Sequence, residues 1–189
     1  MAISKSDDLE RQALEMGASM MALSARTAPK TRGVDSVKTM VLTEKDLERL
    51  AAAMERKTED KSIELPIFKR DAENVRNSAA VLLVGVSRDP KRIELPLNCG
   101  ACGYRDCKAL LAAGKRKGED FTGPVCIFQA VDLGIALGSA AKLAGELNID
   151  NRMMYTVGAA AKKLGLLDSD VIIGIPLSAT GKNPYFDRP

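Results

Sequence analysis

None of the eight residues at 79–86 is polar, and this stretch restricts the fold more than any other part of the sequence. It is too short for the roughly 20 residues that a helix needs to cross a bilayer. Its valines and leucines favour a strand, and a strand without polar residues is buried on both of its faces. We therefore expect 79–86 to lie at the centre of a sheet with helices packed on it.

The rest of the chain predicts mostly helices, which separate a small number of strands. Helices are expected at 7–24, from Thr43 onward, and at 66–77, 127–147 and 151–164, and further strands at 37–42 and 171–175. The expected N-caps are Ser6, Thr43 and Asp150. The chain thus predicts a single α+β domain, 1–189, in which the segment 90–127 is an insertion that interrupts the regular pattern.

Small residues form a stripe along the helix expected at 127–147. The stripe consists of Gly134, Gly138, Ala141 and Gly145. Each glycine inside a helix costs about 1 kcal/mol relative to alanine, so we expect another element to approach this helix closely, in the core or across a dimer interface. Asp132, Lys142 and Glu146 in the same helix argue against a membrane role for the stripe.

Histidine is absent from the 189 residues, which excludes Ser-His-Asp and Cys-His nucleophile systems and histidine-ligated zinc. The 28 Lys and Arg residues are interspersed with 25 Asp and Glu residues, giving a net charge of +3, so nucleic acid is not an expected partner. Five of the first eleven residues are charged, and this stretch lacks the apolar core of a secretory signal. We expect a cytoplasmic protein without a membrane partner.

All four cysteines lie in one region, with the spacing Cys99-x2-Cys102-x4-Cys107 and then Cys126. Thiols stay reduced in the cytoplasm, so grouped cysteines are more typical of metal ligands than of disulfides there. Gly100 and Gly103 allow tight turns that point backbone N–H groups at bridging sulfides. Three nearby ligands and one distant ligand are common for cubane clusters, so the spacing predicts that these four cysteines hold a [4Fe-4S] cluster.

Two other interpretations of the cysteines remain open. A zinc ion with four cysteine ligands is the metal alternative, although zinc sites usually pair Cys-x2-Cys with a second Cys-x2-Cys. Four free cysteines are the simplest alternative, which the crowding of three thiols within nine residues disfavours.

The cysteine segment 98–107, together with Cys126, resembles the small four-cysteine iron-sulfur domain of corrinoid iron-sulfur proteins and of ion-translocating ferredoxin oxidoreductases. The whole chain is similar to a family of small prokaryotic proteins described as ferredoxin-domain-containing. The stretches that carry this similarity are Ala-Pro-Lys-Thr-Arg-Gly-Val-Asp at 28–35, the cysteine set, Asp-Asn-Arg-Met-Met-Tyr at 150–155, and Gly-Lys-Asn-Pro-Tyr-Phe-Asp-Arg at 181–188. This resemblance implies an iron-sulfur protein.

The order of elements also resembles that of FMN-dependent nitroreductases. In those proteins an Ala-Pro loop follows the first helix, a late Lys or Arg helps to hold the flavin phosphate, and two subunits share the flavin sites. The resemblance implies a nitroreductase-like fold with one small, mainly antiparallel sheet, a cluster-binding insertion and a homodimer. The residues that it implies for contacts with the phosphate of FMN are Arg26, Lys30, Arg32, Lys182 and Arg188.

Together these features give two main hypotheses for function. The first is a redox protein whose [4Fe-4S] cluster passes single electrons to or from a flavin, a partner protein or a small-molecule acceptor, as a nitroreductase-like oxidoreductase. The second is a non-enzymatic binding or sensing module in which a cluster or a zinc ion is a structural staple. A partner module like that of the corrinoid proteins is a third hypothesis. The sequence identifies no catalytic residue.

Overall fold

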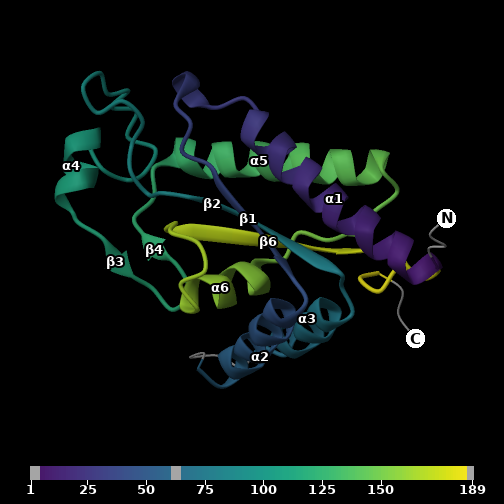
Figure 1. Ribbon diagram of the computed structural model, residues 1–189. Coiled ribbons are helices and arrows are strands. Elements are labelled where there is room, and N and C mark those ends of the chain that lie inside the picture. The colour runs from purple at the N-terminus through teal and green to yellow at the C-terminus, as the bar shows by residue number, and fades with distance from the viewer. Residues whose placement is uncertain (1–4, 61–64, 187–189) are drawn as a thin grey trace.

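The computed structural model describes residues 5–60 and 65–186 (Figure 1). Within these residues, one four-stranded sheet has the order β1-β2-β6-β5. Its strands are β1 (Lys38–Thr43), β2 (Ala80–Val86), β6 (Val171–Ser178) and β5 (Asp150–Asn151). All neighbouring strands in it run antiparallel. The expected small antiparallel sheet, with 79–86 in an inner position, is confirmed.

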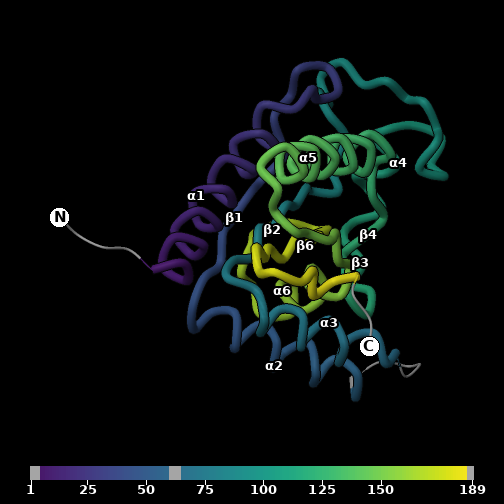
Figure 2. Tube along the Cα trace, turned by 90° about the vertical axis from the view of Figure 1, so that its right-hand side faces the viewer, coloured from purple at the N-terminus to yellow at the C-terminus, as the bar shows by residue number. Residues whose placement is uncertain are grey.

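Helices cover both faces of this sheet (Figures 1 and 2). On one face lie α1 (Ser6–Thr27) and α5 (Ile127–Glu146), and on the other lie α2 (Lys45–Asp60), α3 (Ile67–Arg76) and α6 (Tyr155–Lys163). The two faces of β2 join separate core clusters. Leu82 and Val84 pack with α1 and α5, whereas Val81 and Leu83 pack with the opposite helices. Every residue of β2 is buried, which explains why the strand carries no polar side chain.

The closest approach of a helix to the sheet occurs where α6 lies on β6. A Cβ atom on Gly158 would stand 1.8 Å from the carbonyl oxygen of Ile172, and one on Gly174 would stand 2.0 Å from Val157. Gly158 on α6 therefore faces β6, and Gly174 on β6 faces α6. The absence of a side chain at both positions permits this contact. Neither belongs to the small-residue stripe that the sequence singled out.

The stripe on α5 faces open space. No atom of the described residues lies within 4 Å of a Cβ built on Gly134, Gly138 or Gly145, so the expected close approach within the core is wrong. Buried Leu133 and Ala136 lie on the opposite side of α5, which packs against α1. By length and composition α5 would also be able to cross a membrane, but the core helix of a soluble protein can have the same length and composition.

None of the three residues expected as N-caps stands at an N-cap position. Ser6 is the first helical residue of α1, and Lys5 stands at the N-cap without a side-chain hydrogen bond. Asp150 pairs with Ser178 in β5, so α6 begins only at Tyr155. The reason is that β5 adds a short strand to the edge of the sheet, which the local sequence does not signal. The third expected cap, Thr43, is the last residue of β1.

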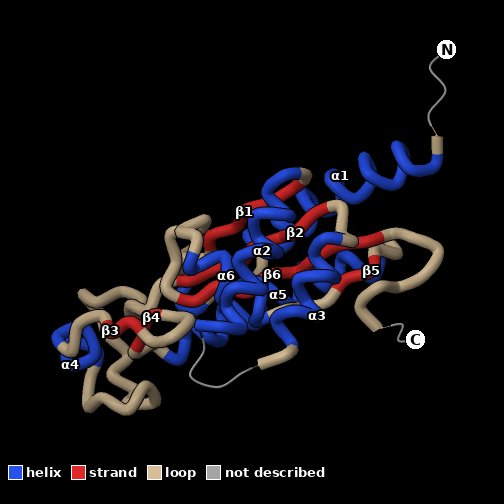
Figure 3. Tube along the Cα trace, turned by 90° about the horizontal axis from the view of Figure 1, so that it is seen from below, coloured by secondary structure: helices blue, strands red, loops and turns tan. Residues whose placement is uncertain are grey.

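The segment between β2 and α5 forms one end of the molecule (Figure 3). It contains α4 (Cys107–Ala112) and a two-stranded sheet of β3 (Arg116–Lys117) and β4 (Thr122–Gly123). The 3-10 turn η1 (Thr31–Gly33) lies in the loop after α1. Arg32 in this turn donates to the carbonyl of Leu95, so the Ala-Pro loop contacts the segment between β2 and α5.

Candidate functional site

A side-chain hydrogen bond closes the loop that carries three of the four cysteines. The side-chain oxygen of Asn98 accepts from the backbone N–H of Cys107 at 3.0 Å. Asn98 directly precedes Cys99, so this bond brings the two ends of the Cys-x2-Cys-x4-Cys stretch together. Asp106 caps α4 by accepting from the N–H of Ala109 at 2.8 Å. Cys107 is therefore held at the start of a helix.

Glycine turns shape the chain inside this loop. Gly100 and Gly103 have φ angles of 72° and 85°, a region that residues with a side chain rarely adopt. The N–H of Gly103 donates to the carbonyl of Gly100 at 2.9 Å. The loop thus makes a tight turn between Cys99 and Cys107, with Cys102 inside the turn.

Cys126 lies at the same end of the molecule, where the segment between β2 and α5 ends. It is the N-cap residue of α5, and its N–H donates to the carbonyl of Arg88 at 2.9 Å. Burial raises the pKa of its thiol, and N–H groups at the start of α5 oppose this rise. Cys107 and Cys102 make smaller contributions that also raise this pKa.

All four cysteines are free thiols. Cys107 and Cys126 are buried, Cys102 is half-buried and Cys99 is exposed. In the described part of the chain, no three Cys, Asp or Glu side chains are close enough together to hold a metal ion. The cysteines thus share one end of the molecule without converging on one point.

The chemistry of the donor set fits an iron-sulfur cluster. Four thiols and no histidine are available in the segment, and cysteine thiolates are the ligands of [4Fe-4S] clusters.

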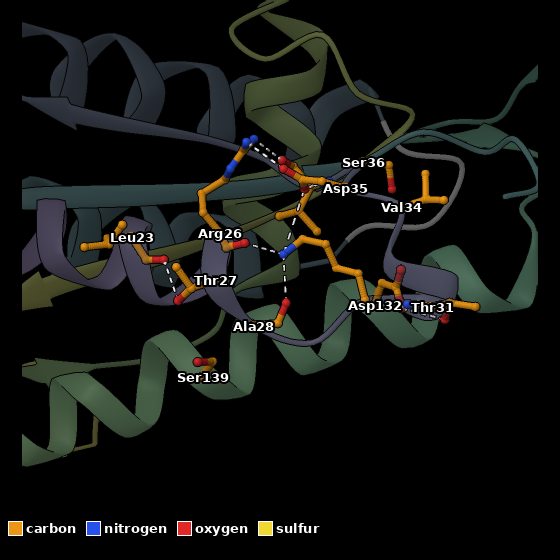
Figure 4. A network of polar contacts seen from close by, with 12 residues as sticks. Leu23, Arg26, Thr27, Ala28, Thr31, Val34, Asp35, Ser36, Asp132 and Ser139 are labelled. Carbon is orange, nitrogen blue, oxygen red and sulfur yellow. Dashed lines mark hydrogen bonds and ion pairs between the residues drawn. The ribbon is translucent and has the colours of Figure 1, made fainter. Parts of the chain in front are cut away.

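Two of the cations expected to bind a flavin phosphate, Arg26 and Lys30, have partners in or beside their own loop (Figure 4), whereas Arg32 donates to the carbonyl of Leu95. Arg26 forms an ion pair with Asp35 at 2.6 Å and donates to the carbonyl of Val37 at 2.6 Å. Lys30 donates to the carbonyl of Ala28 at 2.8 Å and to that of Arg26. Only 7% of the Lys30 side chain is exposed. Both charges are therefore used to hold the loop.

The structure does not bring these cations together with Lys182. Arg26 and Lys30 lie at the end of α1, whereas the tail before Lys182 lies beside its beginning. Ser178 and Thr180 line a cavity of about 610 Å³ with Arg11 and other residues from the first half of α1. A 22-residue helix is about 33 Å long, so one chain does not place both groups around one phosphate. Arg188 lies outside the described residues.

A buried ion pair, which sequence reasoning missed, supports the Ala-Pro loop from α5. Asp132 accepts from the N–H and hydroxyl of Thr31 at 2.9 and 2.8 Å, and its other oxygen lies 2.8 Å from the ammonium of Lys91. Burial would raise the pKa of Asp132, but Lys91 and Thr31 outweigh it and hold the pKa below its usual value. The sequence signal for this ion pair is Asp132 itself, a single carboxylate in the apolar part of the helix expected at 127–147.

Comparison with known proteins identifies relatives of the whole chain. Residues 122–188 match a family described as "Uncharacterized protein containing a ferredoxin domain (DUF2148)", a match that includes Cys126 but not the other cysteines. A protein of Archaeoglobus fulgidus, described as "Uncharacterized protein", is 48% identical over 183 residues, which are 96% of this chain and 95% of that protein.

Solved structures with a similar fold are nitroreductases and their relatives. A nitroreductase-like family protein from Bacillus cereus has a TM-score of 0.55 at 11% identity, over 100% of this chain and 81% of that one. A putative nitroreductase in complex with FMN from Desulfovibrio desulfuricans has a TM-score of 0.54 at 13% identity, with the same coverage. Nitroreductase A from Vibrio parahaemolyticus has a TM-score of 0.53 at 13% identity, over 93% of this chain.

This chain spans only 62% of that last protein. At such identities the likeness shows the fold alone, and the expected nitroreductase-like fold is confirmed. The 48% identity over nearly the full length shows the family. The chain belongs to the family of ferredoxin-domain-containing proteins, built here on a nitroreductase-like fold.

Proposed function

We propose that this chain is an electron-transfer protein whose [4Fe-4S] cluster is held by Cys99, Cys102, Cys107 and Cys126. The observation that carries the proposal is the placement of all four thiols at one end of the molecule, three in a loop closed by the bond from Cys107 to Asn98 and the fourth at the start of α5. The family description and the redox proteins among the fold relatives agree with it.

The cluster, when bound, supplies one-electron chemistry, and the chain binds and orients it. Asn98 and the turn at Gly100–Gly103 fix the loop that carries three ligands. Cys126 is fixed by its N-cap position and by the carbonyl of Arg88. Burial of Cys107 and Cys126 keeps water away from two of the four ligand positions.

Single Cys→Ser substitutions test the ligand assignment. Each should lower iron and sulfide content sharply, because a serine hydroxyl is a poor substitute for a thiolate. Ala101→Ser is the matched control, since it adds a hydroxyl to the same loop and removes no thiol. Full retention of iron in all four cysteine variants would contradict the assignment.

A structural four-cysteine site, with zinc or a cluster as a staple in a non-enzymatic module, is the second candidate. Its support is that Cys107 and Cys126 stand at the starts of two helices, which a shared metal would tie together. Metal loss that changes the oligomeric state, in a protein unable to reduce dyes or quinones, would favour this candidate over electron transfer.

The electron partner that suits this end of the molecule is an acidic protein. Residues 88–126 contain eight Lys and Arg against five Asp and Glu. The exposed cations are Arg92, Arg105, Lys108, Lys115, Arg116 and Lys117. Leu95 and Leu97 are 61% and 47% exposed in the same segment. Such a surface predicts that electron transfer slows as ionic strength rises, and a rate independent of salt would argue for a neutral acceptor.

The homodimer remains a proposal that the stripe on α5 supports. Exposed Val131 and Ile135 lie beside the open positions at Gly134 and Gly138, and Met16 on the neighbouring α1 is 64% exposed. In a symmetric dimer the exposed apolar side chains of one copy would pack against the glycine positions on the same face of the second copy. Sedimentation analysis should give twice the chain mass, and a monomer at micromolar concentration would oppose the proposal.

A further inference from the structure

Arg88 is a buried cation with weak charge compensation among the described residues. The residue is 1% exposed and lies two positions after the end of β2. Its Nη2 donates to the carbonyl of Leu110, and its Nε has no hydrogen-bond acceptor among the described residues. The ion pair that the described chain offers it is with Asp89, at 3.6 Å, and the Asp89 side chain is 46% exposed. Burying a charge with such weak compensation is costly.

The position of Arg88 connects it to both buried cysteines. Its carbonyl accepts from the N–H of Cys126 at 2.9 Å, and its side chain reaches Leu110 in α4, the helix that Cys107 begins. Its own N–H donates to the buried carboxylate of Asp170 at 2.9 Å, which fixes the main chain at this point. Arg88 therefore contacts both elements, α4 through its guanidinium and the start of α5 through its backbone carbonyl.

We propose that the Arg88 guanidinium compensates the negative charge of the cluster and thereby raises its reduction potential. This inference rests on the proposed cluster. Four thiolates make the ligated cluster negative in both redox states, and reduction adds one electron and breaks no bond. A fixed cation in a buried, low-dielectric position stabilises the more negative state. The cluster would in turn compensate the charge of Arg88.

The test is the midpoint potential of the loaded protein, titrated with dithionite as the one-electron donor. Arg88→Gln should lower the equilibrium constant for reduction at least tenfold, which is 59 mV for one electron. Arg88→Lys keeps the charge and should restore most of that shift. Arg105→Gln is the control, because it removes an equal charge next to Cys107 from a side chain that is 91% exposed. Solvent screens that charge, so less than a threefold change is expected.

A potential in Arg88→Gln equal to that in Arg105→Gln overturns the proposal while leaving the cluster in place. Iron release to a chelator is the second measurement, for the case that Arg88→Gln loads poorly. Faster release from Arg88→Gln than from Arg88→Lys supports charge compensation, whereas equal release from both shows that Arg88 only fills space. A wild-type protein without iron and sulfide overturns the proposed function itself and this inference with it.

Discussion

The buried Lys91–Asp132 pair should be one of the most sensitive points of the structure. Its side chains are 2% and 0% exposed, and the two charges lie 2.8 Å apart. Asp132→Asn leaves the ammonium buried with a neutral partner. Removing one member of such a pair typically costs about 3–5 kcal/mol, a large part of the roughly 5–15 kcal/mol that stabilises a domain. For a chain of this length the melting temperature should fall by about 6–20 °C.

Urea denaturation measures this cost, with Asp168→Asn as the matched control. Asp168 forms an ion pair with Lys38 at 2.6 Å, but its side chain is fully exposed, so its loss should leave the unfolding midpoint unchanged. The double variant Lys91→Met/Asp132→Leu replaces both charges. Its loss of unfolding free energy should be clearly less than the sum of the losses for Lys91→Met and Asp132→Leu measured singly. Equal midpoints for Asp132→Asn and Asp168→Asn, or strict additivity in the double variant, would refute the reasoning.

Three further outcomes follow from the described contacts. Because the folded chain holds the pKa of Asp132 below its usual value, this carboxylate adds stability that is complete above the unfolded pKa, about 3.9, and is lost as pH falls through the lower folded value. The unfolding free energies of wild type and Asp132→Asn should therefore converge in acid, and a constant gap would contradict this. Gly158→Ala should destabilise the protein strongly, since the new methyl would stand 1.8 Å from a backbone oxygen. Gly138→Ala should instead stabilise an isolated chain by about 0.5–1 kcal/mol. A melting temperature for Gly158→Ala that is not below that of Gly138→Ala would contradict the packing described here. Because Arg26 and Lys30 lie at the other end of α1 from the tail that carries Lys182, a flavin site that uses both groups needs a second subunit. FMN at saturation should therefore raise the melting temperature of a dimer and leave that of a monomer unchanged, and a saturable rise in a monomer would contradict this.

Local pattern predicted most of the helices and strands. The apolar run at 79–86 forms the inner strand β2. A strand without polar residues is predicted to be buried on both faces, so its composition alone indicated this position. The boundaries of α3 and α5 also lie within one or two residues of the expected ones. The cysteine spacing indicated the region of the candidate site, since three of its members are close in sequence.

Features that depend on distant residues were not predictable in this way. Asp150 has the composition of an N-cap, but pairing with Ser178 places it in β5. Lys91 and Asp132 are far apart in the sequence, so no local period shows their contact. Lys30 looks like a free phosphate ligand until its contacts with nearby carbonyls are seen. In each case tertiary contacts decide the role of a residue that the sequence leaves ambiguous.

The most direct test of the account is the content of iron, acid-labile sulfide and zinc in anaerobically purified protein, together with its visible spectrum. We expect a brown protein with about four irons and four sulfides per chain. A colourless protein that contains zinc, or no metal at all, would contradict the claim that these four cysteines hold a redox cluster.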